Sequence, residues 1–242
     1  MSPRWPRILM YHAVAKIEHD PNRLGISPQR FGAHLHYLKR RGLRGASVRE
    51  LQGAVNEGNA RGLVGLTFDD GYENFLTEAV PLLERHGFTA TVFAVGNRVG
   101  AMNEWEHMYE PRHPMRLMDA EGLREVSARR MEVGSHTLNH ARLPGLEPEL
   151  LREEVVDSRS ILSEILSEAV GGFCYPYGDA DKAAVEAVRR AGYSYACAWK
   201  TQLEWSEYDL PRIPVDQKDD PLRFKTKFRI YAQYAKVFRD RK

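Results

Sequence analysis

Two adjacent carboxylates, Asp69 and Asp70, follow a short apolar segment and form a candidate metal-binding or catalytic pair. Leu63 to Phe68 predicts a strand, which Asp69 and Asp70 follow directly and which Gly71 ends. Neighbouring carboxylates that are buried and charged raise one another's pKa, and a cation removes that effect. One interpretation is therefore an aspartate bound to a metal ion beside an aspartate that acts as a base. The other is a strand followed by an Asp-Gly turn, because both residue types are common in turns.

A second cluster of metal-binding residue types begins 66 residues after Asp70. His136 and His140 follow a strand-like run, and their spacing of four predicts that both rings lie on one face of a helical turn. Together with Asp70 they offer two imidazoles and one carboxylate to an ion and leave a coordination position for water, as in catalytic zinc sites. A single histidine in such a segment is more typical of packing or of the surface.

These residues resemble the motifs of the NodB-like polysaccharide deacetylases, carbohydrate esterase family 4. The first two motifs of that family match two segments, Thr67-Phe68-Asp69-Asp70-Gly71 and His136-Thr137-Leu138-Asn139-His140. Residues 173–178, Phe-Cys-Tyr-Pro-Tyr-Gly, are similar to the third motif, and residues 8–12 and 210–215 are also similar to segments of family members. The resemblance extends from about residue 7 to residue 216.

Strand-like and helical patterns alternate along the chain, which predicts a parallel sheet with helical crossovers. The expected strands are 7–12, 43–46, 63–68, 89–95, 131–135, 173–175, 193–199 and 210–215. The expected helices are 27–41, one beginning at Ser47, 73–86, one beginning at Asp119, 148–167, one that Asp179 caps and that ends near Gly192, and one beyond Pro221. His19, His34, His36 and His86 are expected at the surface or on helix faces.

The family resemblance implies an α/β fold, a distorted (β/α)7 barrel of the NodB-like deacetylase type, which periodicity alone does not separate from an open sheet. It also implies a single catalytic domain over residues 1–242, with a core of about 7–216 and a basic C-terminal helix of about 221–242. In such barrels catalytic groups gather at the carboxyl ends of the strands.

The resemblance implies a metal-dependent hydrolase that removes the N-acetyl group from an amino sugar in a glycan, a glycolipid or a sugar-containing small molecule and releases acetate. Asp70, His136 and His140 would hold one divalent ion, and their nitrogen and oxygen donors favour Zn²⁺. Asp69, left off the metal, would take the proton from the attacking water. Pro176 and Tyr177, in the third motif, are expected beside the substrate and the oxyanion.

Two residues depart from the family pattern. The arginine of the third motif, which orients the basic aspartate in relatives, is replaced by Cys174. Arg212 is the expected substitute, because a guanidinium is always charged and forms two parallel hydrogen bonds with a carboxylate. A salt bridge at the rim is the other interpretation of Arg212.

The second departure concerns the general acid. Many relatives place a histidine late in the chain, yet no histidine follows His140. His12, at the end of the first expected strand, is the candidate acid, and a buried structural histidine is the alternative. His107 and His113 are further options. They lie in residues 96–118, where periodicity disappears and Trp105, Tyr109, Pro111 and Pro114 indicate either a lid or substrate wall, or a packed irregular loop.

Composition limits the remaining function classes. The chain of 242 residues is 43% hydrophobic and 28% charged, and its net charge of +2 does not favour nucleic acid as a partner. Cys174 and Cys197 lie in strand-like runs and are expected as buried thiols. The absence of an apolar leader and of a run of ~20 apolar residues predicts a cytoplasmic protein.

The basic C-terminal stretch allows two interpretations, a solvated helix face or a peripheral contact with anionic lipid and a lipid-linked substrate. The main alternative to an enzyme is a non-catalytic carbohydrate-binding protein on the same barrel. The cysteine in the third motif and the missing late histidine support it, whereas Asp69, Asp70, His136 and His140 favour the enzyme.

Overall fold

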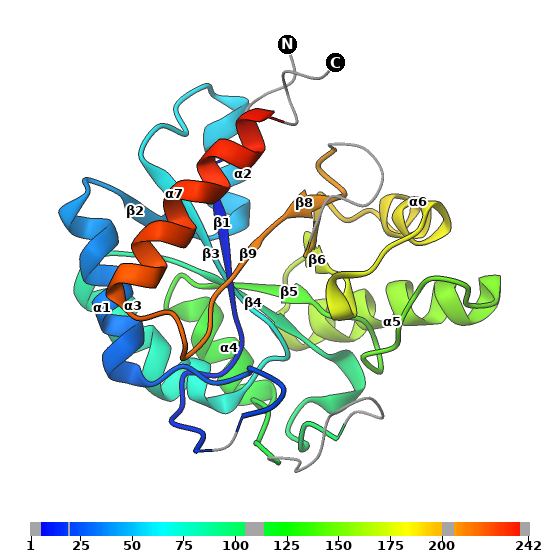
Figure 1. The fold of residues 1–242 in the computed structure, drawn as a ribbon. Coiled ribbons are helices and arrows are strands. Elements are labelled where there is room, and N and C mark those ends of the chain that lie inside the picture. Colours follow the sequence, from blue (N-terminus) through cyan, green and yellow to red (C-terminus); the bar gives the residue numbers. More distant parts are fainter. Residues whose placement is uncertain (1–5, 19, 105–113, 200–205, 238–242) are drawn as a thin grey trace.

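A computed structural model describes residues 6–18, 20–104, 114–199 and 206–237, with the backbone alone for residues 231–237. Helices surround a ring of short strands on the outside (Figure 1). The strands are β1 (Ile8–Tyr11), β2 (Arg44–Ala46), β3 (Leu63–Phe68), β4 (Thr91–Ala94), β5 (Glu132–Ser135), β6 (Gly172–Cys174), β7 (Tyr195–Ala198), β8 (Leu210–Pro211) and β9 (Ile213–Pro214).

The helices follow the strands in alternation. They are α1 (Pro28–Arg40), α2 (Val48–Asn56), α3 (Val80–His86), α4 (Ala120–Ala128), α5 (Pro148–Leu166), α6 (Lys182–Arg190) and α7 (Pro221–Val237), with a π-helical turn (Phe75–Ala79) before α3 and short 3-10 turns at Gly96–Arg98 and Pro176–Gly178. None of the helices within the described residues is long and apolar enough to cross a membrane.

The strands are parallel and form a nearly closed barrel in the order β8-β7-β6-β5-β4-β3-β1-β9, with β2 beside the start of β3. β8 and β9 are two halves of one extended segment, separated only by Arg212. The first half pairs with β7 and the second with β1, so this segment joins the two ends of the strand order. The predicted α/β barrel is confirmed, and Arg212 lies at its closing strand.

Alternating residues of each strand point into the barrel or out toward the helices, as the two-residue period of a strand requires. The outward residues join the main core under the helices, and the inward residues include a second, smaller apolar cluster. Space inside the barrel is limited. A Cβ on Gly134 would approach the ring of Phe93 to 2.5 Å, and a Cβ on Gly172 would approach the hydroxyl of Tyr195 to 2.3 Å. The same two-residue period determines which polar side chains at the strand ends point into the barrel.

The amino end of the barrel interior is closed by the start of α2. The hydroxyl of Thr91 accepts from the backbone N–H of Val48 at 2.8 Å, and Glu132 accepts from the N–H of Arg49 at 2.9 Å and from the Thr91 hydroxyl at 2.6 Å. Glu132 is 2% exposed. A buried carboxyl group that accepts hydrogen bonds from a backbone N–H and a hydroxyl group therefore caps this end.

Most expected elements are confirmed, with three differences. Asp181, rather than Asp179, caps α6, because its side chain accepts from the N–H of Ala184. The last strand is interrupted at Arg212. His34 is buried, because its ring stacks on Phe224 of α7 with centroids 3.9 Å apart. Of the residues expected in a lid, Trp105, His107, Tyr109, Pro111 and His113 lie outside the described residues, and His19 lies outside them too.

Candidate active site

Asp69 and Asp70 lie at the carboxyl end of β3, where the sequence predicts them. The N–H of Asp69 donates to the carbonyl of Tyr11 at 3.0 Å, so its side chain continues the inward alternation of the strand. Asp70 has a φ of 74° and Gly71 a φ of 78°, and the chain turns there in the left-handed region. A Cβ on Gly71 would approach the Cα of Ala94 to 3.1 Å. Both aspartates are buried within this turn.

His136 and His140 direct one ring nitrogen each toward the same carboxylate oxygen. Nε2 of His136 lies 3.5 Å, and Nε2 of His140 lies 3.4 Å, from Oδ1 of Asp70. The carbonyl oxygen of Cys174 accepts from Nδ1 of His136 at 2.9 Å. That bond places the hydrogen on Nδ1 and leaves Nε2 to face Asp70, which is the arrangement of a metal-binding histidine.

The helical turn expected for these histidines is wrong. Residues 136–140 form an irregular loop in which Thr137 has a φ of 67° and His140 a φ of 63°. Residues other than glycine seldom adopt this conformation without stabilising contacts. The two rings nevertheless meet, with centroids 5.0 Å apart, because the loop folds back on itself.

Glu154 of α5 stabilises this loop, a role that the sequence analysis does not predict. Its Oε2 accepts from the N–H of Leu138 at 3.0 Å and of Asn139 at 2.9 Å, and its Oε1 accepts from the Asn139 side-chain amide at 2.7 Å. One carboxylate thus fixes two residues between the histidines. Glu154 lies on a face of α5 that is otherwise buried and uncharged, and an acidic residue on such a face is the signal that could have identified it.

The Asp70 group fits a divalent metal ion. The ligand atoms of Asp70, His136 and His140 all lie within 4.8 Å of one another, and the three residues are buried. Burial raises the pKa of the Asp70 carboxyl, but the two imidazoles outweigh it and hold the pKa well below its ordinary value. Burial lowers the pKa of His140, whereas at His136 the carboxylates outweigh burial and raise the pKa. An ionised carboxylate and two imidazoles form the donor set of catalytic zinc sites.

Arg212 holds Asp69 through two parallel hydrogen bonds. Its Nη1 donates to Oδ1 of Asp69 at 2.6 Å and its Nη2 to Oδ2 at 2.8 Å, and its Nε donates to the carbonyl of Ala198 at 3.1 Å. Arg212 is 1% exposed, which excludes the rim salt bridge. Burial raises the pKa of Asp69, but the Arg212 guanidinium outweighs it and the pKa is lowered. Asp69 is therefore a buried carboxylate that stays ionised.

Cys174 lies beside this pair and belongs to a second group of ligand types with Asp69 and His136. Burial raises the pKa of its thiol well above the ordinary value, and a thiol must lose its proton to bind a metal ion. Nη2 of Arg212 also lies 3.1 Å from the sulfur. A positive guanidinium at that distance opposes a cation, so this second group fits a metal ion less well than the Asp70 group.

The remaining predicted residues surround the two aspartates. Nε2 of His12 lies 3.9 Å from Oδ2 of Asp69, and its side chain is 22% exposed, which excludes a fully buried structural role. Tyr177 has a φ of 61°, is 37% exposed, and places its ring 5.0 Å from that of His140. Pro176 is buried in the same 3-10 turn. The site thus combines a buried ligand group, a buried ion pair, and two partly exposed side chains.

Comparison with known proteins relates this geometry to a family. The family described as polysaccharide deacetylase matches residues 56–196, which is more than half of the chain. The Bacillus subtilis (strain 168) protein YxkH is 27% identical over 188 residues, which cover 77% of this chain and 61% of that protein. A chitin deacetylase from Pestalotiopsis is 29% identical over 150 residues, 62% of this chain and 45% of its own length. The chain therefore spans less than two thirds of these relatives.

Solved structures share the fold across nearly the whole chain. The Streptococcus pyogenes deacetylase PplD in complex with acetate has a TM-score of 0.79 at 22% identity and covers 94% of this chain and 99% of its own. IcaB from Ammonifex degensii has a TM-score of 0.75 at 24% identity and covers 92% of this chain and 96% of its own. These likenesses establish the barrel and leave the chemistry to the residues described above.

Proposed function

Because the chain belongs to the polysaccharide deacetylase family, we propose that it is a metal-dependent hydrolase that removes the N-acetyl group from an amino sugar. The sugar belongs to a glycan, a glycolipid or a sugar-containing small molecule, and acetate is released. The observation that carries this proposal is the meeting of two buried groups, Asp70 with His136 and His140, and Asp69 with Arg212. The first group is suited to a metal ion and the second to a general base.

Asp70, His136 and His140 would hold one divalent ion, for which their nitrogen and oxygen donors favour Zn²⁺. When bound, such an ion polarises an acetyl carbonyl and lowers the pKa of a bound water molecule. The three side chains already lie close together, and Glu154 stabilises the loop that carries the two histidines. They therefore need little rearrangement to act as ligands.

Asp69 accepts the proton of the water molecule as the water oxygen attacks the acetyl carbon. The lowered pKa of Asp69 keeps the carboxylate ionised and ready to accept that proton. Arg212 acts through Asp69, because its two hydrogen bonds hold the carboxylate in one orientation. Arg212 thus takes the positioning role that the third-motif arginine has in relatives.

His12 supplies the proton that the leaving amine needs when the bond between carbon and nitrogen breaks. Its Nε2 is close to Asp69, and its partial exposure gives it access to both substrate and solvent. The exposed ring of Tyr177 and the adjacent Pro176 form a wall beside the substrate, and a backbone N–H near Tyr177 stabilises the oxyanion. The products are acetate and a free amino sugar.

Acetate release from a panel of acetylamino sugars tests the proposal. The panel contains free, nucleotide-linked, lipid-linked and polymeric sugars, each incubated with the protein alone, with a chelator, and with Zn²⁺ restored after chelation. We expect release from one class of sugar, lost with the chelator and regained with Zn²⁺. A protein that binds the sugars and one ion per chain but releases no acetate would instead support a non-catalytic carbohydrate-binding protein.

A further inference from the structure

Positive charge is concentrated in two helices that are far apart in the sequence. α1 and α7 together contain eight Lys and Arg residues and no Asp or Glu, whereas the other 212 residues contain 27 Lys and Arg and 33 Asp and Glu. The near-neutral net charge of the chain therefore conceals a separation of charge between these helices and the rest of the molecule.

The two helices pack side by side on the outside of the barrel (Figure 1). The ring of His34 from α1 stacks on Phe224 from α7, and Tyr37 contacts both Phe224 and Phe228 edge to face. These contacts bury one side of α7 and fix the opposite side outward. The catalytic residues, in contrast, lie inside the barrel.

A groove of about 670 Å³ runs between the two helices and is lined by cations without an acidic side chain. Arg40 and Arg41 contribute from the end of α1, and Lys225 and Arg229 from α7. Within the described part of the chain none of these four side chains forms an ion pair. Arg223 and Lys227, on the other side of α7, pair with the buried Asp219 at 3.2 and 2.5 Å. The groove therefore presents four uncompensated charges.

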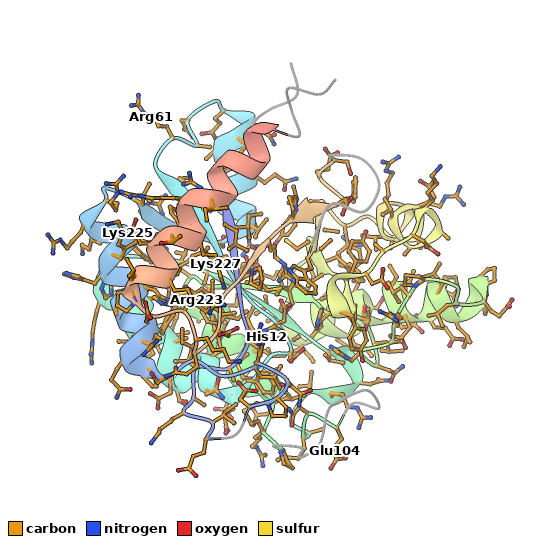
Figure 2. All side chains as sticks on the ribbon, viewed as in Figure 1. His12, Arg61, Glu104, Arg223, Lys225 and Lys227 are labelled. Carbon is orange, nitrogen blue, oxygen red and sulfur yellow. The ribbon has the colours of Figure 1, made fainter. Side chains whose placement is uncertain are left out.

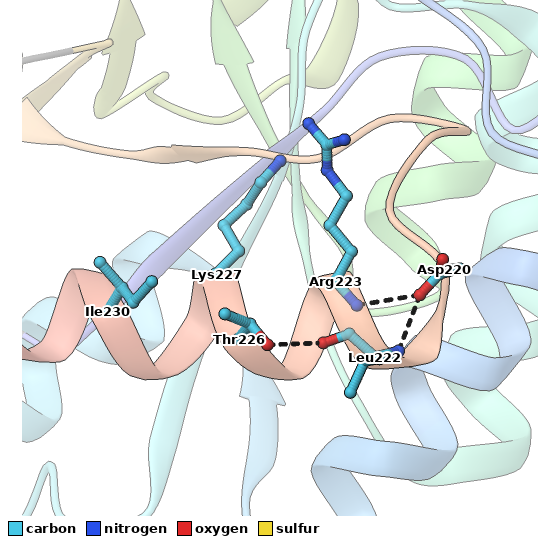
Figure 3. Close-up of a pocket in the computed structure, with 6 residues that line it drawn as sticks. All are labelled: Asp220, Leu222, Arg223, Thr226, Lys227 and Ile230. Carbon is cyan, nitrogen blue, oxygen red and sulfur yellow. Dashed lines mark hydrogen bonds between the residues drawn. The ribbon is translucent and has the colours of Figure 1, made fainter.

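Two large aliphatic side chains are exposed on α7 next to the groove. Leu222 lines the groove itself, whereas Ile230 lines the adjoining pocket of Arg223 and Lys227. Leu222 is 72% exposed and Ile230 is 42% exposed, and they follow one another with Thr226 at intervals of four residues. Figure 3 shows these three residues along α7. Figure 2 labels Lys225, Arg223 and Lys227 on the same helix. A helix that presents both cations and exposed aliphatic side chains has the composition of helices that lie in the interface of a lipid bilayer.

We propose that Arg40, Arg41, Lys225, Arg229, Leu222 and Ile230, together called the α1–α7 surface, bind the headgroup layer of an anionic lipid bilayer. The four cations contact lipid phosphates, and the two aliphatic side chains enter the boundary between headgroups and acyl chains. A soluble polyanion satisfies the cations but leaves Leu222 and Ile230 in water. The combination of charge and exposed apolar surface therefore favours a bilayer over a free polyanion.

Co-sedimentation of the full chain with vesicles tests this proposal. The vesicles contain phosphatidylcholine alone or phosphatidylcholine with phosphatidylglycerol. We expect binding only to the anionic vesicles, weakened by added salt because surface charges are screened. Each cation near an anionic surface strengthens binding about fivefold, so a variant with Arg40, Arg41, Lys225 and Arg229 each changed to Gln should bind about two to three orders of magnitude more weakly.

The matched control removes the same charge elsewhere. Arg85, Arg124, Lys182 and Arg190, from α3, α4 and α6, are exposed, and their change to Gln should leave vesicle binding close to that of the wild type. Both variants should keep the wild-type circular dichroism spectrum. An equal loss of vesicle binding in the two variants would show that only the net charge of the chain matters, and would overturn the proposal.

Leu222→Ala separates the bilayer from a soluble polyanion. We expect this change to weaken vesicle binding on the order of tenfold, through lost apolar contact, and to leave binding of soluble polyphosphate unchanged. Binding of polyphosphate without binding of anionic vesicles would contradict the proposal and assign the groove to a free polyanion. Binding to neutral and anionic vesicles alike would also contradict it.

Discussion

Buried carboxyl groups lie at both ends of the barrel interior, and their surroundings differ. At the carboxyl end, Asp69 has a guanidinium partner in Arg212, and the imidazoles of His136 and His140 flank Asp70. At the amino end, Glu132 has a hydroxyl group and a backbone N–H as hydrogen-bond donors. One end thus provides a guanidinium and two imidazoles as partners, and the other provides a hydroxyl group and a backbone dipole.

The difference appears in the pKa values of these groups. Burial raises the pKa of all three carboxyl groups. The guanidinium beside Asp69 and the two imidazoles beside Asp70 outweigh burial, so the pKa values of these two groups are lowered. At Glu132 the hydrogen bonds do not outweigh burial, and the pKa is raised. The same barrel therefore lowers the pKa of carboxyl groups where chemistry is proposed and raises the pKa of the carboxyl group where the structure is closed. What distinguishes the two ends is the partner rather than the depth of burial.

Asp69→Asn should have the largest effect of the changes that test this comparison. The side chain keeps its size and loses its basicity, so acetate release should fall on the order of 10² to 10⁴-fold for loss of a general base. Metal content should stay at the wild-type level, because Asp70 and the histidines are unchanged. Initial rates with metal analysis of the same samples check this, and an unchanged rate would remove Asp69 from its role.

Arg212→Met should reduce both activity and stability. The change leaves Asp69 buried without its cationic partner, which costs about 3–5 kcal/mol in the free energy of unfolding when a buried pair is broken. Burial then dominates, so the pKa of Asp69 rises and the acidic limb of the rate profile moves to higher pH. Urea unfolding and a pH–rate profile measure the two effects. Arg212→Lys keeps the charge without the paired hydrogen bonds, so its stability and its pH–rate profile should lie between those of the wild type and of Arg212→Met. A wild-type pH–rate profile in Arg212→Met would show that Arg212 does not control the pKa of Asp69.

Glu154→Gln should have an intermediate effect on metal binding. The amide replaces one carboxylate oxygen that accepts hydrogen bonds in the loop between the histidines, so the ligands are less well fixed. Changes in groups that orient metal ligands typically weaken metal affinity about 10–100-fold. Competition with a chromogenic chelator measures that affinity. Equal affinities in wild type and variant would show that Glu154 has only a structural role.

Glu132→Gln should leave activity unchanged and alter the pH dependence of stability. Since the folded pKa of Glu132 is raised, the folded chain holds its proton where the unfolded chain has lost it. Its contribution to stability is full below the unfolded pKa and is lost as the pH rises through the folded pKa. Glutamine cannot titrate, so the free energy of unfolding should decline less over that range than in the wild type. Urea unfolding across pH tests this, and identical pH dependence would contradict the raised pKa.

Strand periodicity predicts much of the site. A run of apolar residues that ends at Asp69 and Asp70 predicts where β3 stops, and the two-residue alternation explains why Asp69, His136 and Arg212 all point into the barrel. Arg212 is predictable for a further reason: the family pattern has an arginine where this chain has Cys174, so another cation is expected beside Asp69. The orientation of strand side chains can be predicted from the sequence, because every second side chain of a strand points to the same face of the sheet.

The loops are less predictable, because tertiary contacts decide their conformation. The spacing of His136 and His140 is that of a helical turn, yet Glu154 from α5 binds the intervening backbone and two left-handed residues replace the turn. His34 likewise belongs to a helix whose outer side α7 covers. In both cases the conformation or burial depends on a contact with another helix, and the local sequence pattern does not reveal that contact.

Acetate release measured together with bound metal, as chelator-treated protein is titrated with Zn²⁺, tests whether Asp70, His136 and His140 form the catalytic metal site. Release should rise in proportion to the ion bound and reach its maximum at one ion per chain. Asp70→Ala should bind no ion at that affinity and release no acetate, whereas Glu132→Gln should follow the wild type. Full release by protein without bound metal, or by Asp70→Ala, would contradict the assignment of Asp70, His136 and His140 as the catalytic metal site.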